Sequence, residues 1–313
     1  GLTVLEALPG GLPGYRLCFN KRAMDTVARL PNLSLGELLS ELKMGQWFRN
    51  YYLLPMGAAI WSCPAKQMLQ FPASSFVRFF HNHGLLTIDN QPQWYTVDGG
   101  SQEYVKKIHN IIGAENIRVS SRVRSVVRKD NKVIVQSESG DDIYDDVIMA
   151  CHADEALALL VDSDDMERDV LSPFGYSINH AILHRDPAQM PQRKRCWSSW
   201  NYLARSQGRE DSAVAVTYWM NSLQGIDERY PLFVTLNPIT PVKPELIFDK
   251  HVFTHPIFTR DAVIAQTHIP RIQGQRHTWF CGAYQGNGFH EDGIKSSVKM
   301  VKAMGYSIPW DEP

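Results

Sequence analysis

The sequence predicts a mixed α/β (α+β) protein with two domains. Its 313 residues fit two domains of roughly 100–200 residues each. A strand over 145–150, a tight turn and a helix over 155–160 follow the pattern of α/β proteins. Segments 176–185 and 213–220 alternate between apolar and polar residues, which predicts antiparallel strands of a second domain.

Composition and charge are those of an ordinary globular protein. Apolar residues make up 44% and charged residues 21% of the chain, so a sizeable core is expected. The formal net charge is -1, from 32 Lys+Arg and 33 Asp+Glu. This balance gives no reason to expect nucleic acid or an anionic membrane as a partner.

The cysteines favour a reducing, cytoplasmic location. Five are scattered along the chain without Cys-x-x-Cys spacing, which indicates neither a disulfide framework nor a zinc site. No stretch approaches the roughly 20 apolar residues of a membrane-spanning helix, and the first residues lack the pattern of a signal peptide. Because the sequence begins with Gly1, a processed form or a piece of a longer protein is one expectation.

The first segment, residues 1–95, is expected to be mostly helical. Residues 1–20 are rich in Gly and Pro and predict a loop. Ser34 and Glu37 form the capping-box pattern, which predicts the start of a helix. The expected helices cover 20–30, 35–42, 46–54 and 72–86, with Pro55 and Pro64 as interruptions.

Three further segments are expected after residue 95. Residues 96–160 contain a helix, a short strand and a hairpin with Asp130-Asn131 at its turn, followed by the strand–turn–helix. Residues 161–270 are largely antiparallel sheet, and residues 271–313 are a strand, a glycine-rich turn and a helix. The further elements expected here are helices over 101–112 and 291–304 and strands over 117–119, 122–128, 132–137, 233–236 and 278–281.

The glycine-rich turn after the last strand is the strongest candidate site. Gly282, Gly286 and Gly288 let the backbone approach a ligand closely. The first N–H groups of the following helix, near Phe289–Gly293, present positive partial charge. Such a helix start stabilises an anion, whether a phosphate or a reduced flavin ring. The alternative is a tight packing turn whose acidic residues simply complement the helix dipole.

Two histidine pairs are weaker candidates. His81 and His83 have a spacing that would suit a metal ion on a strand, but a helix end before Gly84 explains them better. No carboxylate or cysteine pattern supports a metal here, and no metal site is predicted. His251 and His255 are expected on a proline-punctuated loop, where they make structural hydrogen bonds.

A third pair, His152 and Asp154, follows the strand over 145–150. It is either a general base with an orienting carboxylate or a helix start capped by Asp154. No Gly-x-Ser-x-Gly elbow, which would indicate a serine nucleophile, is present.

Aromatic side chains predict an apolar substrate pocket, although core packing explains each of them as well. Tyr218 and Trp219 point to opposite faces if 213–219 is a strand, so at most one of them faces the site. The candidates are Trp61, Trp197, Trp200, Tyr218, Trp219 and Tyr284.

Several segments together resemble the flavin amine oxidase superfamily. The strand, glycine turn, aromatic residue and acidic helix start over 279–297 are similar to its C-terminal flavin motif. Trp94-Tyr-Thr-Val-Asp-Gly-Gly-Ser-Gln-Glu-Tyr-Val105 resembles its Gly-Gly turn and helix. Arg122-Val-Arg-Ser-Val126 resembles the strand whose valine meets adenine, and Asp145–Ala150 resembles the strand that returns to the dinucleotide domain.

Within that superfamily, the chain resembles a subfamily of predicted NAD/FAD-binding proteins that are often encoded near cyclopropane-fatty-acid synthase. The resemblance spans roughly residues 34–305. The stretches that carry it are Tyr52-Leu-Leu-Pro-Met-Gly-Ala-Ala-Ile-Trp-Ser62, Phe79-Phe-His-Asn-His-Gly-Leu-Leu86, Thr217-Tyr-Trp-Met-Asn221 and Trp279–Gly293.

The resemblance implies a two-domain fold with an incomplete Rossmann-type FAD domain, from 96–160 and 271–313, and an antiparallel-sheet substrate domain. It implies FAD as the cofactor and two-electron oxidation or isomerisation of a small, hydrophobic or lipid-like molecule. The residues implied to bind FAD are Val123, Gly282, Ala283, Gly288, Phe289, His290, Glu291 and Gly293. Those implied to contact substrate are Trp61, Trp200, Tyr218 and Tyr284.

One feature of the family is missing from the sequence. Members begin with strand–Gly-x-Gly-x-x-Gly–helix, whose glycines admit the pyrophosphate, and no such pattern occurs here. Pro9-Gly-Gly-Leu-Pro-Gly14 has the wrong glycine spacing, and Pro13 is expected to preclude the helix that should follow. Three alternatives follow: a second chain or segment supplies this part, the chain is a fragment, or it is a non-catalytic scaffold or interaction module.

Overall fold

The computed structural model describes residues 11–61, 63–87, 93, 95–204 and 214–311. The chain forms two compact units, and each combines two separate stretches of sequence. The first unit comprises Gly1–Lys106 and Ser177–His255, and the second comprises Lys107–Tyr176 and Pro256–Pro313. Among the described residues, no helix combines the length and apolar character needed to cross a membrane.

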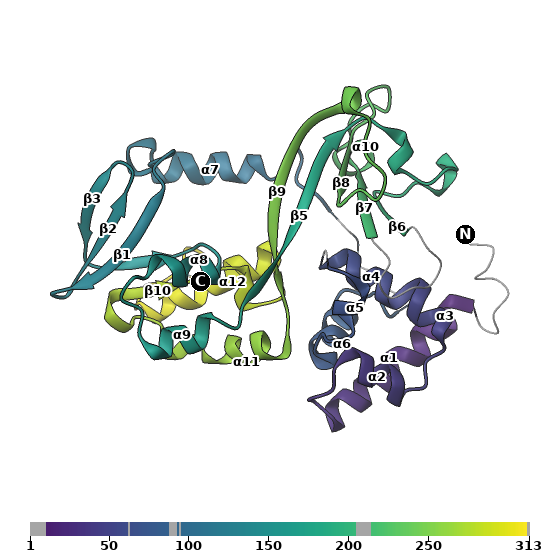
Figure 1. The fold of residues 1–313 in the computed structure, drawn as a ribbon, viewed down its shortest axis with the longest axis horizontal. Helices are drawn as coiled ribbons and strands as arrows, with labels where there is room; N and C mark the ends of the chain where they lie inside the picture. The colour runs from purple at the N-terminus through teal and green to yellow at the C-terminus, as the bar shows by residue number, and fades with distance from the viewer. Residues whose placement is uncertain (1–10, 62, 88–92, 94, 205–213, 312–313) are drawn as a thin grey trace. The chain divides into compact units, whose positions relative to one another are not determined.

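Helices form the N-terminal stretch of the first unit (Figure 1). The predicted capping box is confirmed, because Ser34 and Glu37 each accept a hydrogen bond from the other's backbone N–H, at 3.2 and 2.8 Å. The core of this stretch is a cluster of packed rings around Trp61. The helices are α1 (Gly11–Arg29), α2 (Leu35–Glu41), α3 (Gln46–Phe48), α4 (Leu54–Ile60), α5 (Ala65–Met68) and α6 (Ala73–Asn82).

Two predictions for this stretch are wrong, and both concern proline. Residues 11–20 are helical rather than loop, because a proline in the first turn lacks only an N–H that has no partner within the helix. Pro13 is therefore compatible with α1. Pro55 does not interrupt the next helix, since a π-helical turn over Arg49–Leu53 leads directly into α4. Residues 1–10 of the predicted loop, and Trp94 of the Gly-Gly segment, lie outside the described residues.

A five-stranded sheet forms the rest of the first unit, and its β5 and β9 lie side by side in Figure 1. The loop predicted around His251 and His255 is wrong, because both lie in β9. This strand is last in the order, where Pro256 is tolerated because an edge strand has no partner on one side. The order is β6 (Trp200–Ala204), β7 (Val214–Trp219), β8 (Phe233–Leu236), β5 (Gly175–His184) and β9 (Ile247–Ile257), with the short helix α10 (Met220–Gln224) after β7.

The register of the sheet separates two faces. Trp200 lies directly opposite Tyr218 on the neighbouring strand, so both side chains belong to one face. On the same face Val216 packs against Ala59 of α4. Trp219 points to the opposite face, as the strand alternation predicts.

The second unit contains a three-stranded antiparallel sheet. The predicted hairpin turn is confirmed, because Asp130 and Asn131 have φ values of 51° and 56°, as a tight hairpin turn requires. The structure has no strand at 117–119, where one is predicted, and it has an additional strand, β3. The strands are β1 (Val123–Lys129), β2 (Lys132–Ser137) and β3 (Gly140–Tyr144), and helix α7 (Gln102–Ile112) precedes them.

A parallel pair of strands lies at the centre of the second unit. Met149 and Phe280 pair in register, and both are buried in one core with Tyr284. The helices α9 and α11 have no counterpart among the predicted elements. The pair is β4 (Val147–Met149) and β10 (Thr278–Phe280), and the helices around it are α8 (Ala153–Leu159), α9 (Asp165–Leu171), α11 (Arg260–His268) and α12 (His290–Ala303).

Candidate functional site

The carboxyl ends of β4 and β10 meet at the glycine-rich turn. The N–H of Cys281 donates a 3.1 Å hydrogen bond to the carbonyl of Met149. One residue further, Gly282 has φ 155°, and a Cβ there would lie 2.7 Å from the Tyr284 ring. Any other residue would be strained at this φ and would push the ring aside, so glycine is strongly favoured where the chain leaves β10. Ligands of α/β proteins bind at this edge of a parallel sheet.

The turn leads into the longest helix of the second unit. Gly288 has φ 92°, and Phe289 follows as the N-cap of α12. The N–H of Phe289 donates to the carboxylate of Asp292, at 3.0 Å. The first turn of α12 contains His290, Glu291 and Gly293, so five of the predicted cofactor residues lie on one continuous stretch with Gly282 and Ala283 just before it.

Three amide side chains and one hydroxyl hold this turn in place, and the sequence alone does not predict them. Ser296 accepts a 2.8 Å bond from the N–H of Gly282 and donates to the carbonyl of Gly293. Gln266 donates to the carbonyls of Tyr284 and Gly286. The other two amides, from Gln273 and Gln285, both donate to the carbonyl of Phe280.

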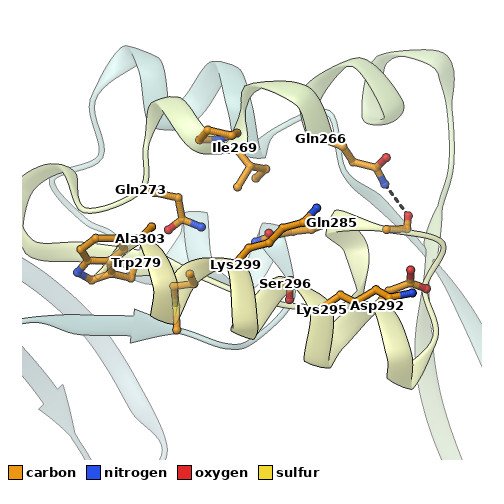
Figure 2. Close-up of a pocket in the computed structure, with 13 residues that line it drawn as sticks. Gln266, Ile269, Gln273, Trp279, Gln285, Asp292, Lys295, Ser296, Lys299 and Ala303 are labelled. Carbon is orange, nitrogen blue, oxygen red and sulfur yellow. Dashed lines mark hydrogen bonds between the residues drawn. The ribbon is translucent and has the colours of Figure 1, made fainter. Parts of the chain in front are cut away.

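A cavity of about 360 Å³ lies beside this turn, between α11 and α12. Figure 2 shows Gln273, Gln285 and Lys299 along it, with Trp279 at one end. Its lining also includes Lys295 and Asp292, so it is polar at the rim. None of the predicted cofactor residues lines it, although Gln285 and Gly286 of the turn do, together with residues of α11 and α12.

His152 and Asp154 both lie at the start of α8, and each has contacts there with other residues. The His152 ring stacks on Tyr176, with centroids 4.2 Å apart, and Asp154 accepts from the N–H of Glu155. The N-cap of α8 is His152, not Asp154 as the alternative reading has it. The hydroxyl of Tyr176 accepts from the N–H of Ala153, and burial raises its pKa, so it stays neutral.

The remaining predicted cofactor residue, Val123, is the first residue of β1 and packs against the core that contains Phe280. Two thiols lie at the carboxyl ends of the parallel strands. Burial raises the pKa of Cys151 and of Cys281, so neither is suited to act as a thiolate nucleophile.

The predicted substrate residues fall into two groups. Trp200 and Tyr218 come together on one face of the first unit's sheet. Trp61 is buried in the ring cluster of the helical stretch, and Tyr284 is buried beside Phe174 in the core of the second unit. Core packing accounts for Trp61 and Tyr284, and Trp200 and Tyr218 are themselves partly buried against the cluster of Ala59, Ala181, Val216 and Leu236.

The structure describes no metal site. His83 is the C-cap of α6 and stacks on Phe79, which agrees with a helix end before Gly84. Among the described residues, no group of three His, Cys, Asp or Glu side chains could hold a metal ion.

Known proteins with a similar sequence or fold identify the family. The model of the family "Flavin containing amine oxidoreductase" matches residues 23–186, more than half of the chain. Among solved structures, the CLA-producing fatty acid isomerase from P. acnes shares the fold at 12% identity and TM-score 0.63, over 96% of this chain and 77% of that chain. Cyclohexylamine oxidase from Brevibacterium oxydans IH-35A does so at 10% identity and TM-score 0.58, over 94% and 76%.

No curated protein sequence matches significantly. The family match runs from within α1 to just past β5, and the two solved structures share the fold over 96% and 94% of the chain. The chain belongs to the family of flavin containing amine oxidoreductases.

Proposed function

We propose that this chain forms the greater part of an FAD-dependent oxidoreductase that oxidises or isomerises a hydrophobic small molecule. The observation that carries the proposal is the turn after β10. It joins the carboxyl ends of two parallel strands to the N-terminus of a 14-residue helix, through a glycine that other residues could replace only with strain. Dinucleotides bind at such an edge in α/β proteins.

The chain's own residues fit a flavin in three ways. The backbone of Gly282 and Ala283 allows close approach of a ligand. The first turn of α12, from His290 to Gly293, presents the positive end of the helix dipole to a negatively charged ring. Ser296, buried against Gly282, keeps that turn rigid, and Val123 is the proposed contact for adenine.

The flavin, when bound, supplies the two-electron chemistry. The protein has to bind and orient the substrate and to exclude water. We assign substrate contacts to the sheet face that carries Trp200 and Tyr218. Burial raises the pKa of Tyr218, and a hydrogen bond with Trp200 lowers it by less; burial raises the pKa of Tyr202 to about 12. This face is thus aromatic and uncharged, which favours an apolar substrate such as an acyl chain, and one protein of similar fold is a fatty acid isomerase.

The first test is the cofactor. We expect the purified chain, alone or together with a strand–Gly-x-Gly-x-x-Gly–helix segment from a protein of this family, to bind FAD with a flavin absorbance spectrum and to release it on denaturation. Candidate acyl substrates are then screened anaerobically by bleaching of that spectrum. The proposal would be refuted if the protein retained no flavin absorbance after free FAD is removed, both alone and together with that segment.

A matched pair of glycine variants localises the cofactor. A Cβ on Gly293 or on Gly45 would meet no atom within 4 Å, so the side chains of Gly293→Leu and Gly45→Leu both start in open space. We expect only Gly293→Leu to weaken FAD binding, by roughly tenfold or more, because a side chain there occupies space at the helix start. Equal FAD affinities of the two variants would show that the flavin does not bind at the start of α12.

The alternative of a non-catalytic scaffold or interaction module is not favoured, because the chain belongs to a flavoprotein family and keeps the glycine geometry of the turn.

A further inference from the structure

The cavity between α11 and α12 has the size of a small-molecule pocket. Its volume of about 360 Å³ lies near the lower end of the range of roughly 300–1,000 Å³ that such pockets have. Residues from α11, β10, the glycine-rich turn and α12 line it, so secondary-structure elements fix most of its shape. Because none of the proposed cofactor residues is among them, the flavin does not account for this cavity.

One end of the cavity is apolar and aromatic. Trp279 lies at this end, close to Ala303 (Figure 2). Its indole N–H donates to the carboxylate of Asp146 at 3.2 Å, which helps to fix the orientation of the ring. The buried residues Met300 and Ile269 also line the cavity. An indole ring and a thioether favour an aromatic or compact apolar group as their contact.

A lysine without an acidic partner lies along the cavity. Of the three lysines of α12, Lys295 pairs with Glu291 at 3.3 Å and Lys302 pairs with Asp311. Lys299 pairs with no carboxylate in the part of the chain that the structure describes, and its side chain lines the cavity (Figure 2). An anionic group in the cavity would be its partner, in surroundings partly shielded from water, where a charge-assisted hydrogen bond is strong.

The other polar groups of the lining limit the charge of such a ligand. The side-chain N–H groups of Gln266 and Gln285 donate to backbone carbonyls, which leaves their oxygens as the groups that can face a ligand. The carboxylate of Asp292 lines the cavity as well. These oxygens repel a second negative charge, so a carboxylate monoanion fits the cavity better than a phosphate dianion.

We propose that this cavity binds a small monocarboxylate with an aromatic or compact apolar body. The carboxylate accepts from the ammonium group of Lys299, and the apolar body packs against Trp279 and Met300. The ligand also contacts side chains that hold the glycine-rich turn, because Ser296 and Gln285 line the same cavity. It is therefore expected to order this turn and to strengthen FAD binding as an effector. That effect on FAD rests on the proposed function, whereas binding of the carboxylate does not.

The test compares phenylacetate with its uncharged counterpart phenylacetamide, using the full chain without flavin. Calorimetric titration measures the affinities. We expect saturable binding of phenylacetate with a dissociation constant of about 1 mM or lower, and roughly tenfold weaker binding of phenylacetamide. Lys299→Met should weaken phenylacetate binding by a similar factor and leave phenylacetamide binding unchanged. The control Lys302→Met, also on α12 but outside the lining of the cavity, should preserve both affinities.

NMR locates the bound ligand. The side-chain amide signals of Gln273 and Gln285 should shift during the phenylacetate titration. The signal of Gln275, which is exposed and does not line the cavity, should stay in place. Saturable binding that shifts neither Gln273 nor Gln285 would place the ligand elsewhere and overturn the proposal.

Three further outcomes would overturn it: no saturable binding of phenylacetate, equal affinities for phenylacetate and phenylacetamide, or equally tight binding of inorganic phosphate, which would indicate an unselective anion site. Adding FAD afterwards separates the two proposals. Tighter FAD binding in the presence of phenylacetate supports the effector role, and an unchanged FAD affinity contradicts that role. A chain that binds phenylacetate in the cavity but never FAD supports the carboxylate site and counts against the proposed cofactor.

Discussion

Ser296 of α12 is hydrogen-bonded to Gly282 and so links the glycine-rich turn to the helix that follows it. Its hydroxyl accepts the N–H of Gly282 at 2.8 Å and donates to the carbonyl of Gly293 at 2.7 Å. The neighbouring Ser297 also donates to Gly293, at 3.1 Å, but makes no such bond to Gly282. Ser297 also forms a hydrogen bond with the thiol of Cys281, so a comparison of the two serines isolates the bond to Gly282.

Ser296→Ala is expected to destabilise the chain by about 1–2 kcal/mol, because the N–H of Gly282 loses a buried partner. It should also weaken FAD binding, because the turn becomes less ordered. Thermal unfolding and flavin titration measure the two effects, with Ser297→Ala as the control that leaves FAD affinity unchanged. Equal FAD affinities for Ser296→Ala and Ser297→Ala would show that the hydrogen bond between Ser296 and Gly282 does not contribute to FAD binding.

Gln273 is expected to contribute most to the stability of the free edge of β10, because it bonds to both backbone groups of Phe280. Gln273→Leu removes an acceptor and a donor from Phe280, although Gln285 keeps one bond to its carbonyl. We therefore expect a loss of about 1–3 kcal/mol in the free energy of unfolding. Denaturant titration measures it, and Gln275→Leu, at an exposed position nearby, is the control. Equal free energies of unfolding for the two variants would show that the amide of Gln273 does not stabilise the edge of β10.

The second unit also contains a buried ion-pair cluster. Arg128, 3% exposed, makes two hydrogen bonds to Glu167, 1% exposed, at 2.9 and 2.7 Å. Arg128→Met leaves the buried carboxylate of Glu167 with only a 3.7 Å pair to Arg276 and the N–H of Asp164, so we expect a loss of about 3–5 kcal/mol. Arg124→Met, which breaks only a 3.6 Å surface pair with Glu138, should cost less than about 1 kcal/mol. A comparable melting temperature for the two variants would contradict this assignment.

The same cluster predicts a loss of stability in acid. Burial tends to raise the pKa of Asp162, but hydrogen bonds from Arg128 and its charge outweigh this, and the pKa is lowered overall. The stabilisation is present above the unfolded pKa of about 4 and is lost as the pH falls through the lower folded value. The stability difference between the wild-type chain and Asp162→Asn should therefore shrink below pH about 4. A difference that stays constant with pH would show that Asp162 does not titrate with folding.

Features set by neighbouring residues are the ones that the sequence predicts well. The capping box of Ser34 and Glu37, the turn at Asp130-Asn131 and the passage from β10 through Gly282 into α12 each depend on a few consecutive residues. The physical causes are local side-chain caps and positive φ angles.

Features that depend on distant partners are the ones that the sequence does not predict. His255 lies in a strand because β5 pairs with that stretch, although its proline suggests a loop. Gln273, Gln266 and Ser296 act through backbone groups 7 to 20 residues away, and nothing in their own neighbourhood indicates this role. The sequence therefore predicts the glycine-rich turn and the helix after it, but not the side chains that hold this turn.

The last prediction concerns a series of buried hydrogen bonds that crosses the sheet of the first unit. The N–H of Asp186 donates to Nδ1 of His184 at 3.0 Å, so the ring proton is on Nε2, which donates to the hydroxyl of Thr235 at 2.7 Å. Thr235 in turn lies 2.9 Å from the hydroxyl of Thr217. Burial lowers the pKa of His184, and the charge of Asp186 raises it by less. The folded chain therefore keeps this ring neutral.

The pH dependence follows from that neutrality. Below about pH 6.5 the unfolded chain binds a proton on this histidine that the folded chain does not. The contribution of His184 is therefore fully present above that pH and is lost as the pH falls through it. His184→Gln cannot titrate, so the stability of the wild-type chain should fall more steeply between about pH 7 and 5 than that of the variant. Thermal unfolding across this range measures the difference, with His109→Gln at an exposed position of α7 as the control for loss of an imidazole. If stability depends on pH in the same way for the wild-type chain and His184→Gln, the folded protein protonates His184 as easily as the unfolded chain does. The hydrogen bonds of both ring nitrogens argue against that result.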